Sequence, residues 1–241
     1  KVQATIGEDG RQELRAVINT SLTDNLAAKF FGTSIQSDGW MPNITLGGHN
    51  GEEDYQAYGV TFLFTPNDRF EALLTIERMD DQSALAAYNQ NFNVAPGVIP
   101  PPPPGPNTTD FSGGLVACAV YAEACRTSPD PLPNAEIDTQ HDASVETDAI
   151  TLQMTYELNE NLTVKYIGGY RDVSEDRIYD FDGSAAPFIT IERWNVYDQT
   201  SHELQLNGSY NNVEFTAGLY MFEKEHTQDW ATGGDFWGFL Y

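Results

Sequence analysis

The sequence repeats one pattern four times: two stretches in which apolar and polar residues alternate, joined by two to four polar residues. The clearest copy runs from Thr200 to Phe222, with the turn Asn211-Asn212 between its two stretches. Alternation with a period of two indicates a β-strand, because successive side chains of a strand point to opposite faces of its sheet. Short Asn-containing turns are typical of hairpins. The pattern therefore predicts hairpins with one apolar and one polar face.

The other three copies have the same form. They are predicted to pair Gln12–Leu22 with Leu26–Ile35, Tyr55–Thr65 with Phe70–Met79, and Asp148–Glu157 with Leu162–Arg171. The turns within these hairpins are short, whereas the connections between hairpins are long. Strands of about ten residues with this asymmetry are what a transmembrane β-barrel requires. We predict an all-β fold: a portion of an antiparallel, up-and-down transmembrane barrel of about eight strands, with short periplasmic turns and long extracellular loops.

The alternation also predicts which side chains face lipid and which face the interior of such a barrel. The residues expected to face lipid include Leu204, Leu206, Phe215, Leu219, Phe62 and Leu152. Those expected to line the interior include Arg15, Lys29, Lys165 and Arg171, where ion pairs within the barrel are their expected role. Aromatic residues near strand ends suit the membrane interfaces: Trp40, Tyr55, Tyr58, Tyr156, Tyr170, Tyr197 and Tyr210. Aromatic enrichment is also common in sheets of every kind, so this pattern is not specific.

Composition agrees with a barrel and excludes a helical membrane protein. Hydrophobic residues make up 40% of the chain and the mean hydropathy is -0.42. No stretch of about 20 apolar residues is present, as a membrane-spanning helix would need. Lys1-Val2-Gln3-Ala4 does not resemble a signal peptide, so a mature chain or an internal fragment is expected.

The formal charge of -24 argues against a nucleic-acid partner. Many of the acidic residues fall in the long connections, for example at 51–54 and 172–182. They fit solubility and mutual repulsion of loops, but carboxylate oxygens are also suitable ligands for a divalent cation. No other cofactor is expected.

The longest connection runs from about Asp80 to Ala143 and contains the unbroken run Pro100–Pro104. Such a run favours a stiff polyproline II segment, which suits a spacer or a peptide for a proline-binding domain. We expect this loop to be extracellular and to contribute to ligand binding, since loops on a rigid scaffold often carry function. The alternative is a cover that packs against other loops, neighbouring protomers or surface proteins.

No enzyme motif is present. His202-Glu203 begins like the zinc-protease motif, but Leu206 occupies the position of the second His. Asp180-Phe181-Asp182-Gly183 resembles only part of a calcium-binding loop. Phosphate-binding and nucleophile-elbow motifs are missing. We predict that the protein is not an enzyme and assign no catalytic, cofactor-binding, metal-binding or ligand-binding residues.

Several strands resemble those of TonB-dependent outer-membrane receptors. The segment 197–206, with Gln199, Ser201 and the run Glu203–Leu206, resembles the start of a barrel strand after an extracellular loop. Val213–Phe222 is similar to the strand that follows it, and Leu22–Phe30 and Phe64–Arg69 are similar to hairpins of the same barrel. These segments cover most of the chain expected to be ordered. Residues 1–241 are thus expected to be part of such a barrel, without a plug domain.

The resemblance implies an active-transport receptor in the bacterial outer membrane. Its extracellular loops would bind a scarce nutrient of the siderophore, cobalamin or glycan type, and a plug domain outside this sequence would couple import to the TonB complex. One alternative is a complete, small eight-stranded barrel that acts as an adhesin or structural anchor. Another is a soluble, secreted β-sandwich that binds ligands with its loops.

Cys118 and Cys125 are predicted to form a disulfide bond, because they are an isolated, closely spaced pair in a protein expected to be exported. Closing so short a loop should add at most about 2–3 kcal/mol to local order. Alkylation before and after reduction tests the bond. Both thiols should react only after a reductant is added, and reaction without reductant would rule the bond out.

Overall fold

The computed structural model describes residues 1–84, 134–135, 137–183, 185 and 187–234, and every regular element in them is a strand. None of these residues belongs to a helix that could cross a membrane. The strands are β1 (Val2–Ile6), β2 (Gln12–Thr23), β3 (Leu26–Ser37), β4 (Met41–Pro42), β5 (His49–Asn50), β6 (Glu53–Asn67), β7 (Phe70–Asp81), β8 (Asp142–Asn159), β9 (Leu162–Asp180), β10 (Thr190–Tyr210) and β11 (Val213–Gly233).

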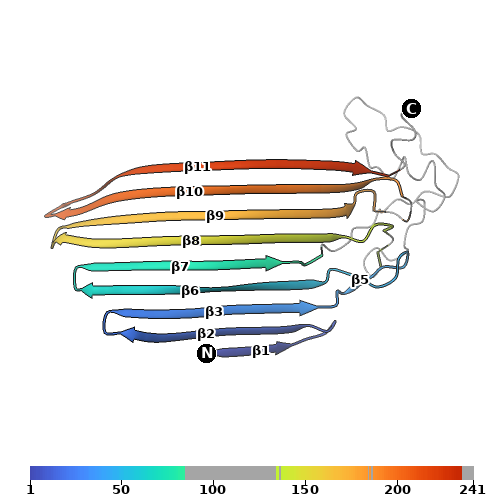
Figure 1. Ribbon diagram of the computed structural model, residues 1–241, viewed down its shortest axis with the longest axis horizontal. Coiled ribbons are helices and arrows are strands. Elements are labelled where there is room, and N and C mark those ends of the chain that lie inside the picture. The colour runs from blue at the N-terminus through green and yellow to red at the C-terminus, as the bar shows by residue number, and fades with distance from the viewer. Residues whose placement is uncertain (85–133, 136, 184, 186, 235–241) are drawn as a thin grey trace, which may run out of the picture.

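Nine strands form one antiparallel sheet in the order β1-β2-β3-β6-β7-β8-β9-β10-β11, while β4 and β5 make a small separate hairpin. Each strand of the large sheet pairs with the next one along the chain, apart from the step over β4 and β5 (Figure 1). This is the predicted all-β, up-and-down arrangement. The sheet is open in the described residues, with β1 and β11 at its edges.

The predicted short turns all lie at one end of the sheet and the long connections at the other (Figure 1). Local hydrogen bonds explain why Asn residues occur at these turns. The Asn67 side chain accepts a bond from the Arg69 N–H at 3.0 Å, and the Asn159 side chain accepts one from the Asn161 N–H at 2.9 Å. Asn211 has a φ of 51°, in the left-handed region that tight hairpin turns require and that Asn tolerates.

Strand register shows which side chains share a face, because directly paired residues of neighbouring strands point the same way. Three successive rows on one face are almost entirely apolar, and we call them the apolar belt. The rows are Leu26, Phe64, Ala72, Met154, Tyr166, Leu204, Leu219; Ala28, Phe62, Leu74, Leu152, Gly168, His202, Met221; and Phe30, Val60, Ile76, Ile150, Tyr170, Thr200, Glu223. The remaining residues predicted to face lipid, Leu206 and Phe215, lie on the same face.

The opposite face, which we call the polar face, carries Arg15, Lys29, Lys165 and Arg171, as the alternation predicts for an interior. Arg15 forms an ion pair with Glu13 at 2.5 Å on this face. Lys29 lies over the Phe31 ring, with its Nζ 5.5 Å from the ring centre. Polar side chains also pair across strands, as in the 3.1 Å bond between the hydroxyls of Thr61 and Thr75.

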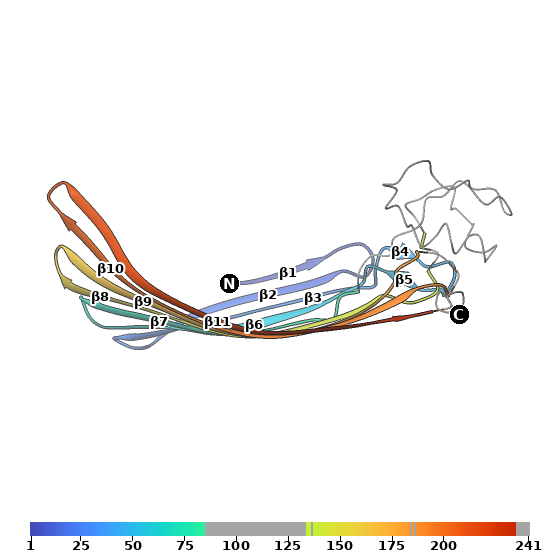
Figure 2. The same cartoon turned by 90° about the horizontal axis from the view of Figure 1, so that it is seen from above.

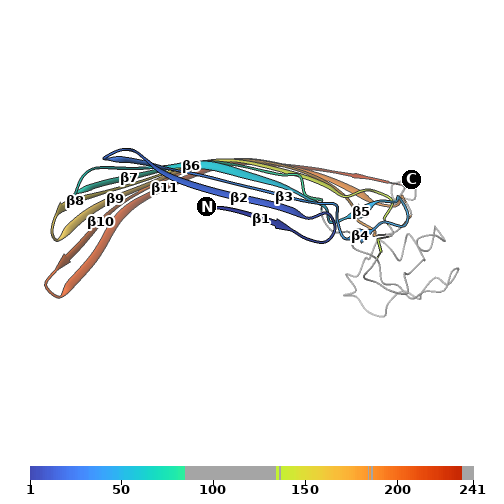
Figure 3. The same ribbon diagram turned by 90° about the horizontal axis from the view of Figure 1, so that it is seen from below.

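Seen on edge, the sheet is a single curved layer (Figures 2 and 3). The predicted alternative of a β-sandwich is therefore wrong for the described residues, since a sandwich has two packed sheets. Belt residues stay open to the surroundings: 77% of Leu219, 48% of Leu204 and 44% of Ile150 is exposed. An apolar sheet face in water must be covered by another layer, whereas lipid can cover it directly.

The belt ends on the loop side at a row of charged residues. These are Arg78 and four acidic residues, Asp148, Asp172, Asp198 and Glu225, and we call them the acidic row. On β9 the outward residues are apolar or aromatic from Leu162 to Tyr170, and Asp172 follows. The nine residues Leu162–Tyr170 span about 30 Å at about 3.3 Å per residue, or about 23 Å of height for a strand tilted by about 40°. An outer-membrane barrel has an apolar band of about this height.

The predicted interfacial aromatics divide between the two faces. Tyr58, Tyr156, Tyr170 and Tyr210 point outward near the two limits of the belt, as predicted. The prediction is wrong for Tyr55 and Tyr197, whose side chains lie on the polar face and not on the lipid face. It is also wrong for Trp40, which lies in a connection and not at a strand end. Tyr197 packs there against Lys224, whose Nζ is 4.3 Å from its ring centre.

Four strands are much longer than predicted. Residues 172–198 were expected to form a loop, but β9 continues to Asp180 and β10 begins at Thr190. The third hairpin likewise begins at Asp142 instead of Asp148, and β11 continues beyond Phe222 to Gly233. The physical reason is that these strands rise above the belt, so their outward residues become acidic. Alternation persists there, but it is no longer alternation of apolar with polar residues.

The expected count of eight strands is also too low. β1 was not predicted, because its five residues are too few to display a clear period. Pairing with β2, which places Val2 opposite Ala16, makes it a strand. β4 and β5 were not predicted either, since each has only two residues and depends on contacts with a distant segment.

Adjacent substitutions on β8 test the assignment of the two faces. Leu152→Arg should destabilise the membrane-embedded protein by roughly 2–4 kcal/mol, because it places a charge near the middle of the lipid face. Thr151→Arg, one residue away on the polar face, should have a much smaller effect. Unfolding of both variants in a lipid bilayer is the measurement, and equal destabilisation would contradict the assignment.

Candidate ligand-binding site

Three connections meet at the end of the sheet opposite the hairpin turns (Figure 1). They are residues 38–52 between β3 and β6, the described residues of 134–141 before β8, and the described residues of 181–189 between β9 and β10. We call their meeting point the loop cluster.

Backbone hydrogen bonds join the first two connections. The Ala135 N–H donates to the Pro42 carbonyl at 2.7 Å, and the Ile44 N–H donates to the Ala135 carbonyl at 2.9 Å. Asn43 adds a side-chain bond from its Nδ2 to the Ile137 carbonyl at 3.3 Å. These bonds pair segments that are about ninety residues apart in sequence, which is why hydrophobic periodicity could not reveal them.

Burial is concentrated in the loop cluster, not between faces of the sheet. Met41, Ala135 and Ile137 form an apolar core, and Phe188 and Ile137 are completely buried. The polar residues buried beside them include Asn43, Asn50, His141, Asp180 and Asp182. The cluster therefore has its own small interior and forms an ordered base for the loops.

Two buried aspartates, Asp180 and Asp182, hold the backbone of the third connection. Asp180 accepts hydrogen bonds from the N–H of Gly183 at 2.7 Å and from the N–H of Asp138 at 3.1 Å. Asp182 accepts one from the Ile189 N–H at 2.8 Å. The partial calcium-loop motif at 180–183 thus serves to fix the loop and tie it to the segment before β8. Within the described residues, no group of three or more acidic, His or Cys side chains is placed to hold a metal ion.

Burial raises the pKa of Asp180 to about 8, and the neighbouring Asp182 and Asp138 carboxylates add to this effect. Burial likewise raises the pKa of Asp138. Asp180 lies above the acidic row that limits the belt, outside the part of the strand that would meet lipid. At neutral pH the folded protein therefore favours a protonated Asp180.

The other acidic run, at 51–54, borders an open hollow of about 520 Å³ near the first connection. Glu53 in this run contacts Arg11 and accepts a hydrogen bond from the Ser37 hydroxyl at 3.2 Å. At least part of the run is therefore neutralised within the protein.

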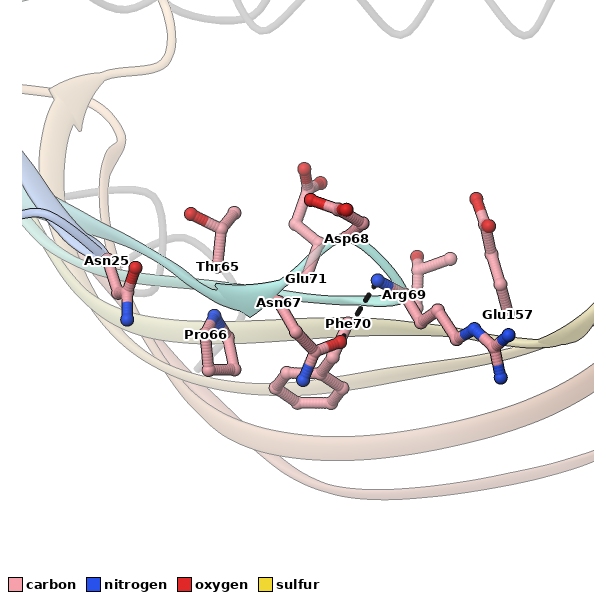
Figure 4. A pocket seen from close by; sticks show the side chains of 10 residues that line it. Asn25, Thr65, Pro66, Asn67, Asp68, Arg69, Phe70, Glu71 and Glu157 are labelled. Carbon is pink, nitrogen blue, oxygen red and sulfur yellow. Dashed lines mark hydrogen bonds between the residues drawn. The ribbon is translucent and has the colours of Figure 1, made fainter.

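Another hollow of about 500 Å³ lies at the hairpin-turn end, around the turn between β6 and β7 (Figure 4). The labelled side chains separate in the figure, with Thr65, Asp68, Glu71 and Glu157 on one side of the ribbon and Pro66, Asn67 and Phe70 on the other. This separation continues the two faces of the sheet into the turn. The hollow lies far from the loop cluster, and we assign it no ligand.

Other predicted site residues fall outside the described part of the chain. Cys118 and Cys125 lie there, as does most of the connection from Asp80 to Ala143. This connection is slightly shorter than expected, because β7 continues to Asp81 and β8 begins at Asp142. Both ends are fixed: the Gln82 N–H donates to the Asp54 carbonyl at 2.8 Å, and the hydroxyls of Thr139 and Thr190 are 2.9 Å apart.

One charged group on the polar face was not predicted. Glu175 contacts both Arg177 and Arg193, at 3.1 Å for Arg193, and accepts a hydrogen bond from the Asn195 Nδ2 at 2.8 Å. These residues were predicted to lie in a loop, where no facing could be derived. The available signal in the sequence was the spacing of two residues between Glu175 and Arg177 and between Arg193 and Asn195, which places each pair on one face of a strand.

Comparisons with known proteins bear on the fold. No family model and no curated protein matches the sequence. Among solved structures, the ferric yersiniabactin uptake receptor FyuA from Yersinia pestis is similar over 97% of this chain and 32% of its own, at 14% identity and a TM-score of 0.70. The fold of the present chain is that of a segment of an outer-membrane β-barrel.

Two further structures support this assignment. The siderophore receptor PiuA from Acinetobacter baumannii covers 93% of this chain and 30% of its own, at 12% identity and a TM-score of 0.64. The ferric-catecholate import receptor Fiu from Escherichia coli K12, in its open form, covers 92% and 33%, at 12% identity and a TM-score of 0.65. The predicted resemblance to TonB-dependent receptors is confirmed for the fold, and these neighbours are transport receptors and not enzymes. The chain spans about a third of the length of each.

The pKa of Asp180 leads to a prediction about pH. A raised pKa means that the folded loop cluster holds a proton that the unfolded chain releases above about pH 4. The cluster should therefore be most stable at low pH and lose stability as pH rises through about 8. Hydrogen exchange of the Gly183 and Ile189 amides, corrected for the intrinsic effect of pH, should show protection that falls from about pH 4 to about pH 8 and levels off above it.

Asp180→Asn should remove this pH dependence, because an amide of the same size cannot ionise. Asp142→Asn, which changes an exposed carboxylate at the start of β8, is the matched control and should leave the dependence intact. An unchanged pH profile in Asp180→Asn would show that another group is responsible.

Proposed function

We propose that this chain forms part of the barrel wall of an outer-membrane receptor that binds a small-molecule nutrient outside the cell and imports it. The apolar belt is the observation that carries the proposal. It lies on one face of a single-layer sheet, has the height of a membrane's apolar band, and is limited by charges on the loop side. Such a sheet is suited to lipid on one face and a water-filled or plugged interior on the other.

The arrangement of the connections supports the receptor role. In outer-membrane barrels the short turns face the periplasm and the long loops face outward. That rule places the loop cluster at the cell surface, where its bonded connections would form a rigid base for ligand capture. Energy coupling through a plug domain and the TonB complex is part of the proposal, and so is a nutrient of the siderophore, cobalamin or glycan type.

The alternative of a complete eight-stranded barrel is not favoured. Nine strands form the described sheet and it remains open at β1 and β11. Unpaired strand edges cannot remain in lipid, because no water is there to satisfy their N–H and C=O groups. The fold neighbours are transport receptors about three times as long as this chain.

Growth of cells that lack the gene tests the transport role. The deletion strain and the same strain with the gene restored are grown with iron, cobalamin or a glycan carbon source limiting in turn. The deletion should slow growth under one of these limitations only, and restoring the gene should reverse the defect. Collapsing the proton gradient should abolish the uptake that the restored gene provides, because import needs coupled energy.

Two results would contradict the proposal. Growth that is identical under every limitation would exclude an importer of these nutrients. A surface-attachment defect with normal growth would favour the adhesin or anchor instead.

A further inference from the structure

Above the apolar belt, the two faces of β8–β11 carry opposite charges. The loop-side parts of these strands are residues 142–149, 171–180, 190–199 and 224–233, and we call them the upper wall. Every basic residue in these ranges lies on the polar face: Arg171, Arg177, Arg193 and Lys224. The acidic residues that charge the outward face are Asp142, Glu146, Asp148, Asp172, Asp176, Glu192, Asp198, Glu225 and Asp229, while Asp180 on the same face is buried in the loop cluster.

Glu175 is the single acidic residue of the upper wall that lies on the polar face. The wall is thus positive on the face that would line the receptor's interior, within a chain whose formal charge is -24. A concave surface lined by charges of one sign concentrates ions of the opposite sign. The interior face of the upper wall therefore favours anions, although the protein as a whole repels them.

The strongest concentration of this charge is a pair of arginines. Arg177 and Arg193 are direct partners across β9 and β10, and both contact the same oxygen of Glu175. Like charges placed directly opposite each other destabilise a sheet. One carboxylate compensates only one of the two guanidinium groups, so the pair keeps a net positive charge.

Glu175 is itself fully engaged. Its Oε1 contacts the two arginines and its Oε2 accepts the 2.8 Å bond from Asn195. It thus fixes the orientation of both guanidinium groups, whose side chains remain 29% and 32% exposed. Several N–H groups of the pair can still donate, because each guanidinium carries five. A planar oxyanion such as a carboxylate can be held by two parallel bonds from such a group.

An aromatic residue completes the surroundings. Trp230 on β11 is the direct partner of Arg193 and lies on the same polar face, with 71% of it exposed. Its indole lies next to Arg193 and offers a flat apolar surface beside that positive charge. The group lies three residues from the Asp180–Thr190 pair, where the loop cluster begins, so a ligand entering past the loops meets it early.

We propose that Arg177, Arg193 and Trp230, positioned by Glu175 and Asn195, form a binding subsite for a small anionic ligand that carries carboxylate groups. This inference rests on the proposed function, since it needs the polar face to be the interior of a receptor. It adds the chemical class of the ligand and the residues that contact it. Phosphate groups share the recognised chemistry, so the test must separate the two kinds of oxyanion.

Equilibrium dialysis of the full-length protein in detergent, with radiolabelled citrate as the probe, tests the subsite. The double variant Arg177→Gln, Arg193→Gln should bind citrate at least about tenfold more weakly than the unmodified protein. Arg78→Gln is the matched control, because it removes an arginine that lies on the outward face and pairs with Glu146 and Asp148. Heat resistance in detergent, measured for each variant, shows that the barrel is folded.

Further arms identify what is recognised. Unlabelled citrate should displace the probe much better than inorganic phosphate if carboxylates are preferred, and equal displacement would overturn that preference. Arg193→Lys should restore part of the affinity lost in Arg193→Gln, since it keeps the charge but loses the paired bonds. Equal loss in Arg78→Gln would show that net charge, and not this subsite, controls binding.

Citrate binding that is undetectable in the unmodified protein, or unchanged in a folded double variant, would overturn the subsite. Neither result would bear on the receptor role, which the growth experiment tests in cells without reference to these arginines. Failure of the growth experiment with intact citrate binding would instead leave an anion-binding barrel that imports none of the nutrients tested.

Discussion

Hydrocarbon offers no hydrogen-bonding partner to a backbone N–H or C=O group, so a chain that crosses a membrane must satisfy these groups within itself. The sheet does this by continuous ladders between neighbouring strands. Every residue of β10 pairs with a residue of β11, from Thr190 opposite Gly233 to Tyr210 opposite Val213. The ladder between β9 and β10 is also unbroken. Because these ladders use the backbone completely, the side chains are free to differ on the two faces. The apolar belt, the polar face and the position of the loops all follow from that freedom.

A single layer has no interior, and each of its faces is therefore adapted to a different environment. Below the acidic row the contrast is between apolar and polar residues, and above it the contrast is between negative and positive charge. The outward acids suit an exposed surface, where repulsion keeps segments apart. The inward arginines would instead attract an oxyanion from solution. The same period of two thus separates lipid from water along one part of a strand and two kinds of charge along the next part.

Hydrophobic alternation was sufficient to predict the parts of the strands that lie within the belt, together with their turns and facing. Residues 150–156 and 162–170 show why, since each outward side chain there is apolar, aromatic or glycine. The same method ended β9 too early, because Asp172, Ser174 and Asp176 are outward but polar. The loop cluster could not be derived at all, since Asn43 and Ile137 meet only after the sheet has brought their connections together.

The orientation of the sheet in a bilayer is the central claim, and spin labels on β8 test it directly. Single labels at each position from 148 to 156 of the full-length protein, embedded in lipid, report collisions with oxygen, which dissolves in hydrocarbon, and with a polar nickel chelate. Oxygen accessibility should alternate with a period of two, with maxima at 150, 152 and 154, and the chelate should be favoured at 148. Equal accessibility at even and odd positions, or an alternation with maxima at 151 and 153, would contradict the account.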